Sequence, residues 1–167
     1  AYELDYNEEV NSLRNQLIAS IKSHLVSDVP VGLFLSGGID SNVLAAVMAK
    51  ESRENINAFT VGFSEDHKFD EIVDAKKTSD YLGLNHSIIK VTPNEALIHT
   101  QNFLIALDQP TIDGLNTYIV SGVVRDHGIK VALSGLGADE LFGGYPSFVD
   151  VPKIMRMLKF SSIVPPT

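Results

Sequence analysis

The chain has 167 residues, of which 44% are hydrophobic and 20% charged. This length suits one domain, and the apolar content is sufficient for a core, which excludes an intrinsically disordered protein. The 21 acidic residues outnumber the 13 basic ones and cysteine is absent, so a nucleic-acid partner is not expected, and disulfides and thiolate chemistry are excluded.

Apolar residues recur alternately at helical spacing and in short continuous runs along the chain. Helical spacing predicts helices, and the short runs predict strands that are buried on both faces. In chain order the predicted elements are a helix through residues 13–25, a strand at 31–36, a helix at 41–50, a strand at 56–63, a helix at 70–82 closed by Gly83, a strand at 86–92, helices at 94–107 and 115–127, and a strand at 129–134. This alternation predicts an α/β fold: a doubly wound parallel sheet with helices on both faces, in a Rossmann-like arrangement.

Residues 153–160 form a basic and apolar segment near the end of the chain. Two interpretations stay open: a helix on a membrane surface or, as we favour, a helix that packs against another part of a larger protein. The sequence contains no apolar run of membrane-spanning length, and its first ten residues lack the layout of a signal peptide. We therefore expect a cytoplasmic protein without a membrane partner.

The segment 35–41, with the sequence LSGGIDS, joins a predicted strand to a predicted helix. Its glycine N–H groups, the helix N-terminus and the hydroxyls of Ser36 and Ser41 could together bind a phosphate. The segment is neither a kinase-type phosphate loop, which has a lysine, nor a GxGxxG dinucleotide motif. Since Asp40 would repel phosphates, we expect a divalent cation that bridges Asp40 and the phosphates, and Mg²⁺ is the first candidate. The alternative is an ordinary turn in which Asp40 and Ser41 cap the helix.

A second glycine-rich segment, LSGLGADELFGGY at residues 133–145, follows the last predicted strand. In doubly wound sheets ligands bind beyond the carboxyl ends of the strands, and both glycine-rich segments lie at such ends. Asp139 and Glu140 are therefore expected at the same edge as Asp40, where Asp40 and Asp139 could share one cation. The alternative is a helix with acidic residues in its first turn, which is a common arrangement.

Both segments resemble motifs of a known family. SGGIDS is similar to the SGGxDS signature of the N-type ATP pyrophosphatases, which cleave ATP between the α and β phosphates. The segment that ends in DELFGGY resembles the asparagine synthetase family within this group. The stretches SHLVSDVPVGLFLSGGIDS, FTVGF, FDE and DQPTID agree with that family, and the resemblance extends from about Leu13 to Tyr145.

The resemblance implies an enzyme that activates a carboxylate, by family default aspartate, as an acyl-adenylate with release of pyrophosphate. Ammonia then displaces AMP to form the amide, which is asparagine when the carboxylate is aspartate. ATP and Mg²⁺ are the implied cofactors. By motif, Leu35 and Val61 would line the adenosine, Ser134 and Gly135 would contact the nucleotide, Ser36, Gly37, Gly38 and Ser41 would hold the pyrophosphate, and Asp40 and Asp139 would bind Mg²⁺. The resemblance assigns a catalytic part to Asp40, Asp139 and Ser36.

Three features depart from the family pattern. The family's glutaminase domain, with its N-terminal cysteine, and the later part of its synthetase domain are absent from residues 1–167, so we expect a partial ATP-binding domain of a larger protein that carries a glutaminase domain. Leu136 stands where the family usually has glutamate, which leaves open a carboxylate other than aspartate as the substrate.

Three further alternatives stay open for the function of the chain: an ATP-binding fragment without activity of its own, a different pyrophosphatase and a purely structural domain. Assembly as a homodimer also stays open.

Other polar residues have simpler explanations. His86 begins a predicted strand and is expected to be a core or surface histidine rather than part of a site. Asp108 and Asp113 belong to a turn, and Lys76 and Lys77 to a solvated helix face.

Overall fold

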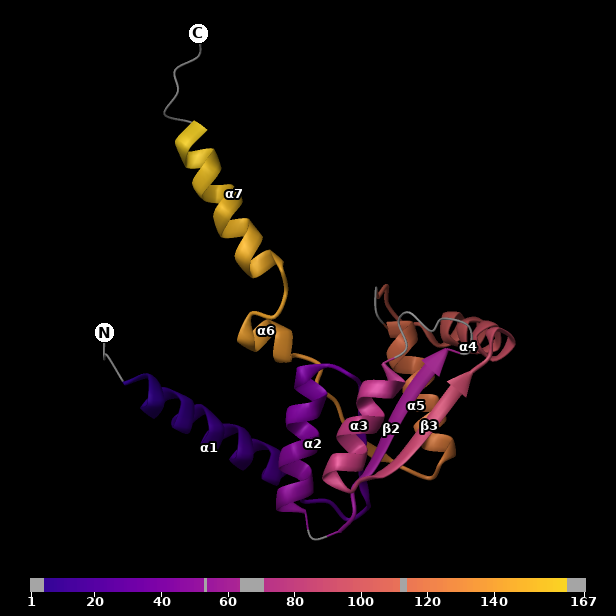
Figure 1. The fold of residues 1–167 in the computed structure, drawn as a ribbon. Helices are drawn as coiled ribbons and strands as arrows, with labels where there is room; N and C mark the ends of the chain where they lie inside the picture. The colour runs from indigo at the N-terminus through magenta and orange to yellow at the C-terminus, as the bar shows by residue number, and fades with distance from the viewer. Residues whose placement is uncertain (1–4, 53, 64–70, 112–113, 162–167) are drawn as a thin grey trace. The chain divides into compact units, whose positions relative to one another are not determined.

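The computed structural model describes residues 5–52, 54–63, 71–111 and 114–161, which fall into two compact units, residues 1–134 and 135–167. The first unit contains α1 (Tyr6–His24), β1 (Val31–Phe34), α2 (Ile39–Glu51), β2 (Asn57–Phe63), α3 (Ile72–Leu82), β3 (Asn85–Val91), α4 (Pro93–Ala106), α5 (Gly114–Asp126) and β4 (Val131–Leu133). The second contains α6 (Ala138–Phe142) and α7 (Ser147–Ser161). Every predicted helix and strand is present, with shifted ends (Figure 1).

The strands β1 to β4 form one parallel sheet in the order β3-β2-β1-β4. Leu33 of β1 pairs with Ala58 of β2 and with Leu133 of β4. The chain moves outward from β1 to β3 through α2 and α3, and then α4 and α5 return it to β4 on the other side of β1. The strand order therefore reverses between β1 and β4, the place where ligands bind in sheets of this kind. The predicted doubly wound parallel sheet is confirmed.

Both faces of the sheet are covered. Right-handed crossovers place α2 and α3 on one face and α4 and α5 on the other, and Figure 1 shows α2 and α3 on one side of β2. On the first face Leu33 and Ala58 belong to a buried cluster with Met48 of α2. Phe59 points to the opposite face and is also buried, with its ring edge against the ring of His127. Burial of neighbouring strand residues on opposite faces explains why these strands are continuous apolar runs.

The ends of the elements follow local chemistry. Gly83, which was predicted to close the helix, adopts the left-handed conformation with φ 67°, and its N–H donates to the carbonyl oxygen of Ser79. At the start of α4, the Thr92 hydroxyl accepts the Glu95 N–H while the Glu95 carboxylate accepts the Thr92 N–H. The strand predicted at 129–134 is shorter in the structure, where β4 pairs with β1 at the edge of the sheet formed by the described residues.

The helix predicted at 153–160 is part of the longer helix α7 in the second unit. Its apolar side chains are exposed: Ile154 54%, Met155 55%, Met157 71% and Leu158 61%. Packing of α7 against another part of the protein therefore stays a prediction. In the part of the chain that the structure describes, no helix is long and apolar enough to cross a lipid bilayer.

Candidate functional site

A buried serine organises the turn between β1 and α2. Ser41 lies in the first turn of α2 and is 6% exposed. Its hydroxyl oxygen accepts the Ser36 N–H at 3.1 Å, lies 3.0 Å from the Ser36 hydroxyl, and lies 3.1 Å from the Gly38 carbonyl oxygen. Because a hydroxyl has one proton and two lone pairs, these three contacts use its full capacity for hydrogen bonds within the turn. Ser41 thus stabilises the turn from within, and a bond from its hydroxyl to a ligand would replace one of these contacts.

Two N–H groups of the turn that could bind a phosphate already have acceptors. The Gly38 N–H donates to the Ser36 hydroxyl at 3.1 Å, and the Gly37 N–H donates to a carboxylate oxygen of Glu71 at 3.2 Å. Glu71 is exposed and immediately precedes α3. Glu71 is the last residue of the FDE stretch, and no role was predicted for it from the sequence. Because a carboxylate binds this turn, its donors fit an anionic group.

The two glycines of the turn lie close to their neighbours and have no unusual backbone angles. A Cβ atom at Gly37 would lie 3.3 Å from the Cβ atom of Asp74 and 3.5 Å from that of Glu71. A Cβ atom at Gly38 would lie 3.3 Å from the Ser36 hydroxyl oxygen. A side chain at Gly37 would therefore require a shift of a few tenths of an ångström between the turn and α3.

The N-terminus of α2 adds positive electrostatic potential beside this turn. Gly38 is the N-cap residue and supplies no side-chain cap to the first N–H groups of α2. Asp40 lies in the first helical turn and is half-buried. The next residue but one, Asn42, donates through its side-chain amide to the Gly37 carbonyl oxygen at 3.4 Å. Asn42 was not singled out from the sequence, although it follows the signature directly.

Leu35 and Val61, which are expected to line adenosine, lie on neighbouring chain segments. Leu35 is 3% exposed, and its side chain belongs to the core. Its N–H donates to the Phe59 carbonyl oxygen at 2.9 Å, and its carbonyl oxygen accepts the Thr60 hydroxyl at 2.7 Å. Val61 is half-buried and follows Thr60 in β2.

His86 lies beside this network instead of at the surface. Its Nε2 atom is 2.7 Å from the Thr60 hydroxyl oxygen, and the residue is half-buried. Burial lowers the pKa of His86, the positive charge of Lys76 lowers it further, and Asp80 opposes both effects. The histidine is thus a satisfied residue of the fold, and its partner Thr60 was not recognised from the sequence.

Stability should fall as the pH drops below the ordinary histidine pKa, in part because of His86. The folded protein favours the neutral ring, so the unfolded chain binds more protons once the pH falls below about 6.5. The contribution of His86 is therefore present above that pH and is lost as the pH falls toward the lowered pKa. Urea unfolding at pH 7.5 and 5.5 should show a smaller pH effect in His86→Gln than in the unchanged chain. An equal effect in both would contradict this account.

In the second unit, the segment after β4 builds a compact corner around Asp139. Asp139 and Glu140 occupy the first turn of α6, and Gly143 ends the helix with φ 71°. A Cβ atom at Gly144 would collide with the carboxylate of Asp139. Gly144 thus leaves the space that the Asp139 carboxylate fills, which accounts for the second glycine of DELFGGY.

Glu140 is held on the other side of this corner. The Tyr145 hydroxyl donates to its carboxylate at 2.7 Å, and this bond lowers the pKa of Glu140. The Tyr145 ring stacks on Phe148 with ring centres 6.4 Å apart. Leu136 lies ahead of the corner and is 69% exposed. Tyr145 therefore fixes Glu140, while Asp139 packs against Gly144.

Residues 12–162 match the protein family described as asparagine synthase. The chain belongs to the asparagine synthase family. The glutamine-hydrolysing asparagine synthetase 1 of Bacillus subtilis is 41% identical over 138 residues, which are 81% of this chain and 21% of that protein. The amidase chyE of Penicillium rubens is 32% identical over 161 residues, which are 84% of this chain and 23% of that protein. The chain therefore spans about a fifth of the length of these relatives.

A solved structure has a similar fold. The NH3-dependent NAD synthetase of Campylobacter jejuni matches with a TM-score of 0.56 and 23% identity, over 85% of this chain and 61% of that one. At this identity the likeness supports the fold, and it agrees with the parallel sheet and surrounding helices described above.

The asparagine synthase family comprises ATP-dependent ligases. In this member, the first unit brings together at the end of β1 most of the residues expected at the nucleotide: Leu35, Ser36, Gly37, Gly38, Asp40 and Ser41. Val61 lies in the adjacent strand, and Ser134 follows β4. Gly135 and Asp139 belong to the second unit. Asp113 lies outside the described residues.

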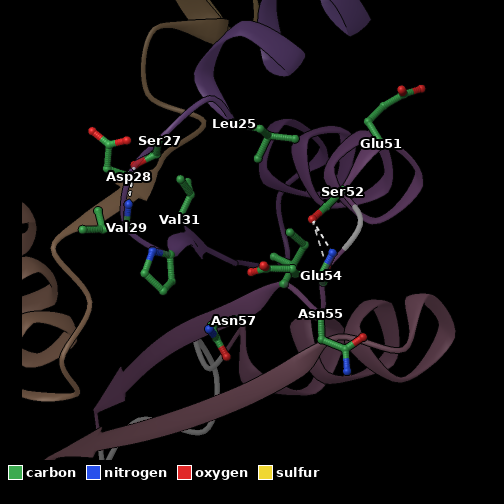
Figure 2. A pocket seen from close by; sticks show the side chains of 12 residues that line it. Leu25, Ser27, Asp28, Val29, Val31, Glu51, Ser52, Glu54, Asn55 and Asn57 are labelled. Atoms are coloured by element: carbon green, nitrogen blue, oxygen red, sulfur yellow. Dashed lines mark hydrogen bonds between the residues drawn. The ribbon is translucent and has the colours of Figure 1, made fainter.

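A cavity of about 580 Å³ lies at a different place in the first unit (Figure 2). It is lined by residues at the amino ends of β1 and β2, among them Asp28 and Glu54, and by none of the residues expected at the nucleotide. Ligands of doubly wound sheets bind at the carboxyl ends of the strands. We therefore take the turn between β1 and α2, and not this cavity, as the candidate site.

Proposed function

We propose that this chain supplies the ATP-binding region of a larger amide-forming ligase. A substrate carboxylate attacks the α-phosphorus of ATP, which gives an acyl-adenylate and pyrophosphate. Ammonia then attacks the acyl carbon, AMP leaves, and the amide is formed. The observation that carries the proposal is the bond from the Gly37 N–H to the Glu71 carboxylate, because an anionic group already binds the SGG turn.

The backbone of the turn would hold the pyrophosphate part of ATP. Gly37 and Gly38 would donate through their N–H groups, Ser36 through its hydroxyl, and Ser41 would hold the turn in place behind them. Leu35 and Val61 would line the adenosine, and Ser134 and Gly135 would contact the nucleotide. Positioning and charge neutralisation account for most of such a reaction, so the proposal requires few acid–base groups.

Asp40 and Asp139 would bind Mg²⁺, which when bound would neutralise charge on the pyrophosphate. The chemistry of the donors fits this ion, because Mg²⁺ is held by one or two carboxylates together with phosphate oxygens and water. Within the described ranges, no three side chains of histidine, cysteine, aspartate or glutamate gather as a metal site. With two carboxylates, the ion would need phosphate oxygens of the nucleotide and water to complete its coordination.

Aspartate is the first candidate for the carboxylate, because the Bacillus subtilis relative is named an asparagine synthetase. A different carboxylate is the second candidate, because Leu136 is exposed where the family motif usually has glutamate. Leucine cannot accept a proton and would offer an apolar surface to the acceptor. Ammonia would come from solution or from a glutaminase domain of the larger protein. The proposal also includes a cytoplasmic location of the larger protein and its assembly as a homodimer.

Calorimetric titration of the chain with ATP, with and without Mg²⁺ and with GTP as the control, tests the nucleotide site. We expect ATP with Mg²⁺ to bind more tightly than ATP alone and than GTP. The protein that carries this chain should then release pyrophosphate from ATP when it is given ammonia and a carboxylate, with aspartate tested in a panel. Failure of the chain to bind ATP at millimolar concentration would contradict the proposal, as would pyrophosphate release without amide.

Removal of the negative charge of Glu71 should strengthen pyrophosphate binding by roughly threefold, because an exposed charge contributes less than about 1 kcal/mol. In the free chain the Glu71 carboxylate competes for the Gly37 N–H and repels a phosphate. Glu71→Gln retains an acceptor for that N–H but loses the charge. Calorimetry with pyrophosphate and Mg²⁺ measures the effect, with Asp80→Asn on the exposed side of α3 as the matched control. Weaker binding by Glu71→Gln would instead mean that Glu71 supports the ligand.

A further inference from the structure

We infer that Thr60 is a positioning residue for the nucleotide turn, and that His86 holds Thr60 in its working orientation. The inference rests on the proposed function, since it concerns how the turn is kept ready to bind ATP. Thr60 lies in β2, is 3% exposed, and contacts Leu35 and His86 through one hydroxyl.

The direction of each hydrogen bond follows from the partners. The Leu35 carbonyl oxygen can only accept, so the single proton of the Thr60 hydroxyl must point to it across 2.7 Å. The Thr60 oxygen is then an acceptor toward His86, and the Nε2 atom of His86 must carry a proton to donate across 2.7 Å. A directed chain therefore runs from His86 in β3 through Thr60 in β2 to the end of β1. A neutral His86 is fixed in the tautomer protonated at Nε2.

This series of hydrogen bonds holds the peptide group between Leu35 and Ser36. The carbonyl of Leu35 and the N–H of Ser36 belong to the same planar unit and point in opposite directions. Thr60 binds the carbonyl at one end, and the Ser41 hydroxyl accepts the N–H at the other end at 3.1 Å. The first peptide of the signature is thus held at both ends, and neither bond can be kept if it rotates.

The next N–H groups along the chain are those expected to bind the pyrophosphate. The Gly37 N–H already holds a carboxylate, and the Gly38 N–H follows it. The Gly37 N–H belongs to the next peptide, which is joined to the held peptide through Ser36. By fixing the Leu35–Ser36 peptide, Thr60 fixes where Ser36 and the two glycines begin, so less of the turn has to be ordered when the ligand binds.

The Thr60 hydroxyl can be removed with little change of shape by Thr60→Val, and retained without the methyl group by Thr60→Ser. We expect Thr60→Val to bind ATP with Mg²⁺ about fivefold more weakly, a loss typical of one buried hydrogen bond. Thr60→Ser should lose stability through the missing methyl group yet bind ATP as the unchanged chain does. Ser79→Ala is the matched control, because Ser79 is 1% exposed and its hydroxyl bonds to Leu84 on another part of the fold.

Calorimetry at a temperature where all variants are folded gives the affinities, and urea unfolding gives the stabilities. Amide hydrogen exchange should show faster exchange of the Ser36 N–H in Thr60→Val but not in Ser79→Ala, and nitrogen NMR should find the His86 proton on Nε2. Equal ATP affinity of Thr60→Val and the unchanged chain would overturn the inference alone, as would an equal loss in Thr60→Ser. Absence of ATP binding by the unchanged chain would overturn the inference together with the proposed function.

Discussion

Replacement of Asp40 by asparagine should remove most of the gain that Mg²⁺ gives to ATP binding. Asp40 lies in the first turn of α2, beside the N–H groups of the SGG turn, and is half-buried. Asparagine keeps the size of the side chain but loses the charge that a magnesium ion requires. Since metal-ion charge stabilisation amounts to several kcal/mol, we expect ATP affinity in the presence of Mg²⁺ to fall on the order of 100-fold. Without Mg²⁺ the affinity should rise slightly, because a repulsive charge is gone.

Glu8→Gln offers a control for this substitution. Glu8 also lies in the first turn of a helix, α1, and is exposed. Each change removes one favourable interaction with a helix dipole, about 0.3–1 kcal/mol. Asp40→Asn and Glu8→Gln should therefore lose similar stability from this source but differ in Mg²⁺ dependence. Calorimetric titrations at several Mg²⁺ concentrations decide this, and the same Mg²⁺ dependence in both variants would refute a metal-binding role for Asp40.

The fold could be predicted because its causes are local in the sequence. Neighbouring residues such as Ala58 and Phe59 are buried on opposite faces, so a strand covered on both sides is a run of apolar residues. Gly83 marks a helix end because a left-handed residue is needed there, and its φ of 67° agrees. The strand ends were less predictable. Leu35 still donates to Phe59, although the regular strand β1 ends at Phe34.

The contacts that build the site were less accessible from the sequence. The Gly37–Glu71 bond joins residues 34 positions apart, and the Thr60–His86 bond joins residues 26 positions apart. No periodicity links such pairs, since their separation depends on the lengths of the connecting helices and on strand register. Ser41 was singled out for its hydroxyl, but its burial and its contacts inside the turn depend on how α2 packs on the sheet.

The two motifs differ in what the structure adds to them. In the first unit, the SGG turn has a carboxylate at its donors, and its peptide is held by Thr60 and Ser41. In the second unit, the DELFGGY segment shapes the surroundings of a carboxylate, because Gly144 lies directly against Asp139. Under the proposed function, the first segment would donate to the pyrophosphate and Asp139 of the second would be a ligand of Mg²⁺.

Substitution of Gly144 by alanine should impair the proposed metal site as much as removal of the Asp139 carboxylate itself. A Cβ atom at residue 144 collides with that carboxylate, so the Asp139 side chain has to leave its position. Loss of a group that orients a metal ligand costs roughly 10–100-fold in metal affinity, and we expect ATP affinity with Mg²⁺ to fall by that range. Since the clash is with the far end of a movable side chain at an exposed glycine, the loss of stability should be small.

Gly122→Ala is the matched control for Gly144→Ala, because Gly122 lies in α5 and a Cβ atom there would meet nothing within 4 Å. Alanine in that helix should leave binding unchanged and raise stability by about 0.5–1 kcal/mol. In the double variant Gly144→Ala with Asp139→Asn, the loss of affinity should not exceed that of Asp139→Asn alone, because both changes act on one carboxylate. Two outcomes would show that Gly144 shapes the segment around Asp139 without affecting metal binding. One is that the losses of ATP affinity from the two changes add up in calorimetry. The other is that Gly144→Ala retains full Mg²⁺-dependent ATP binding.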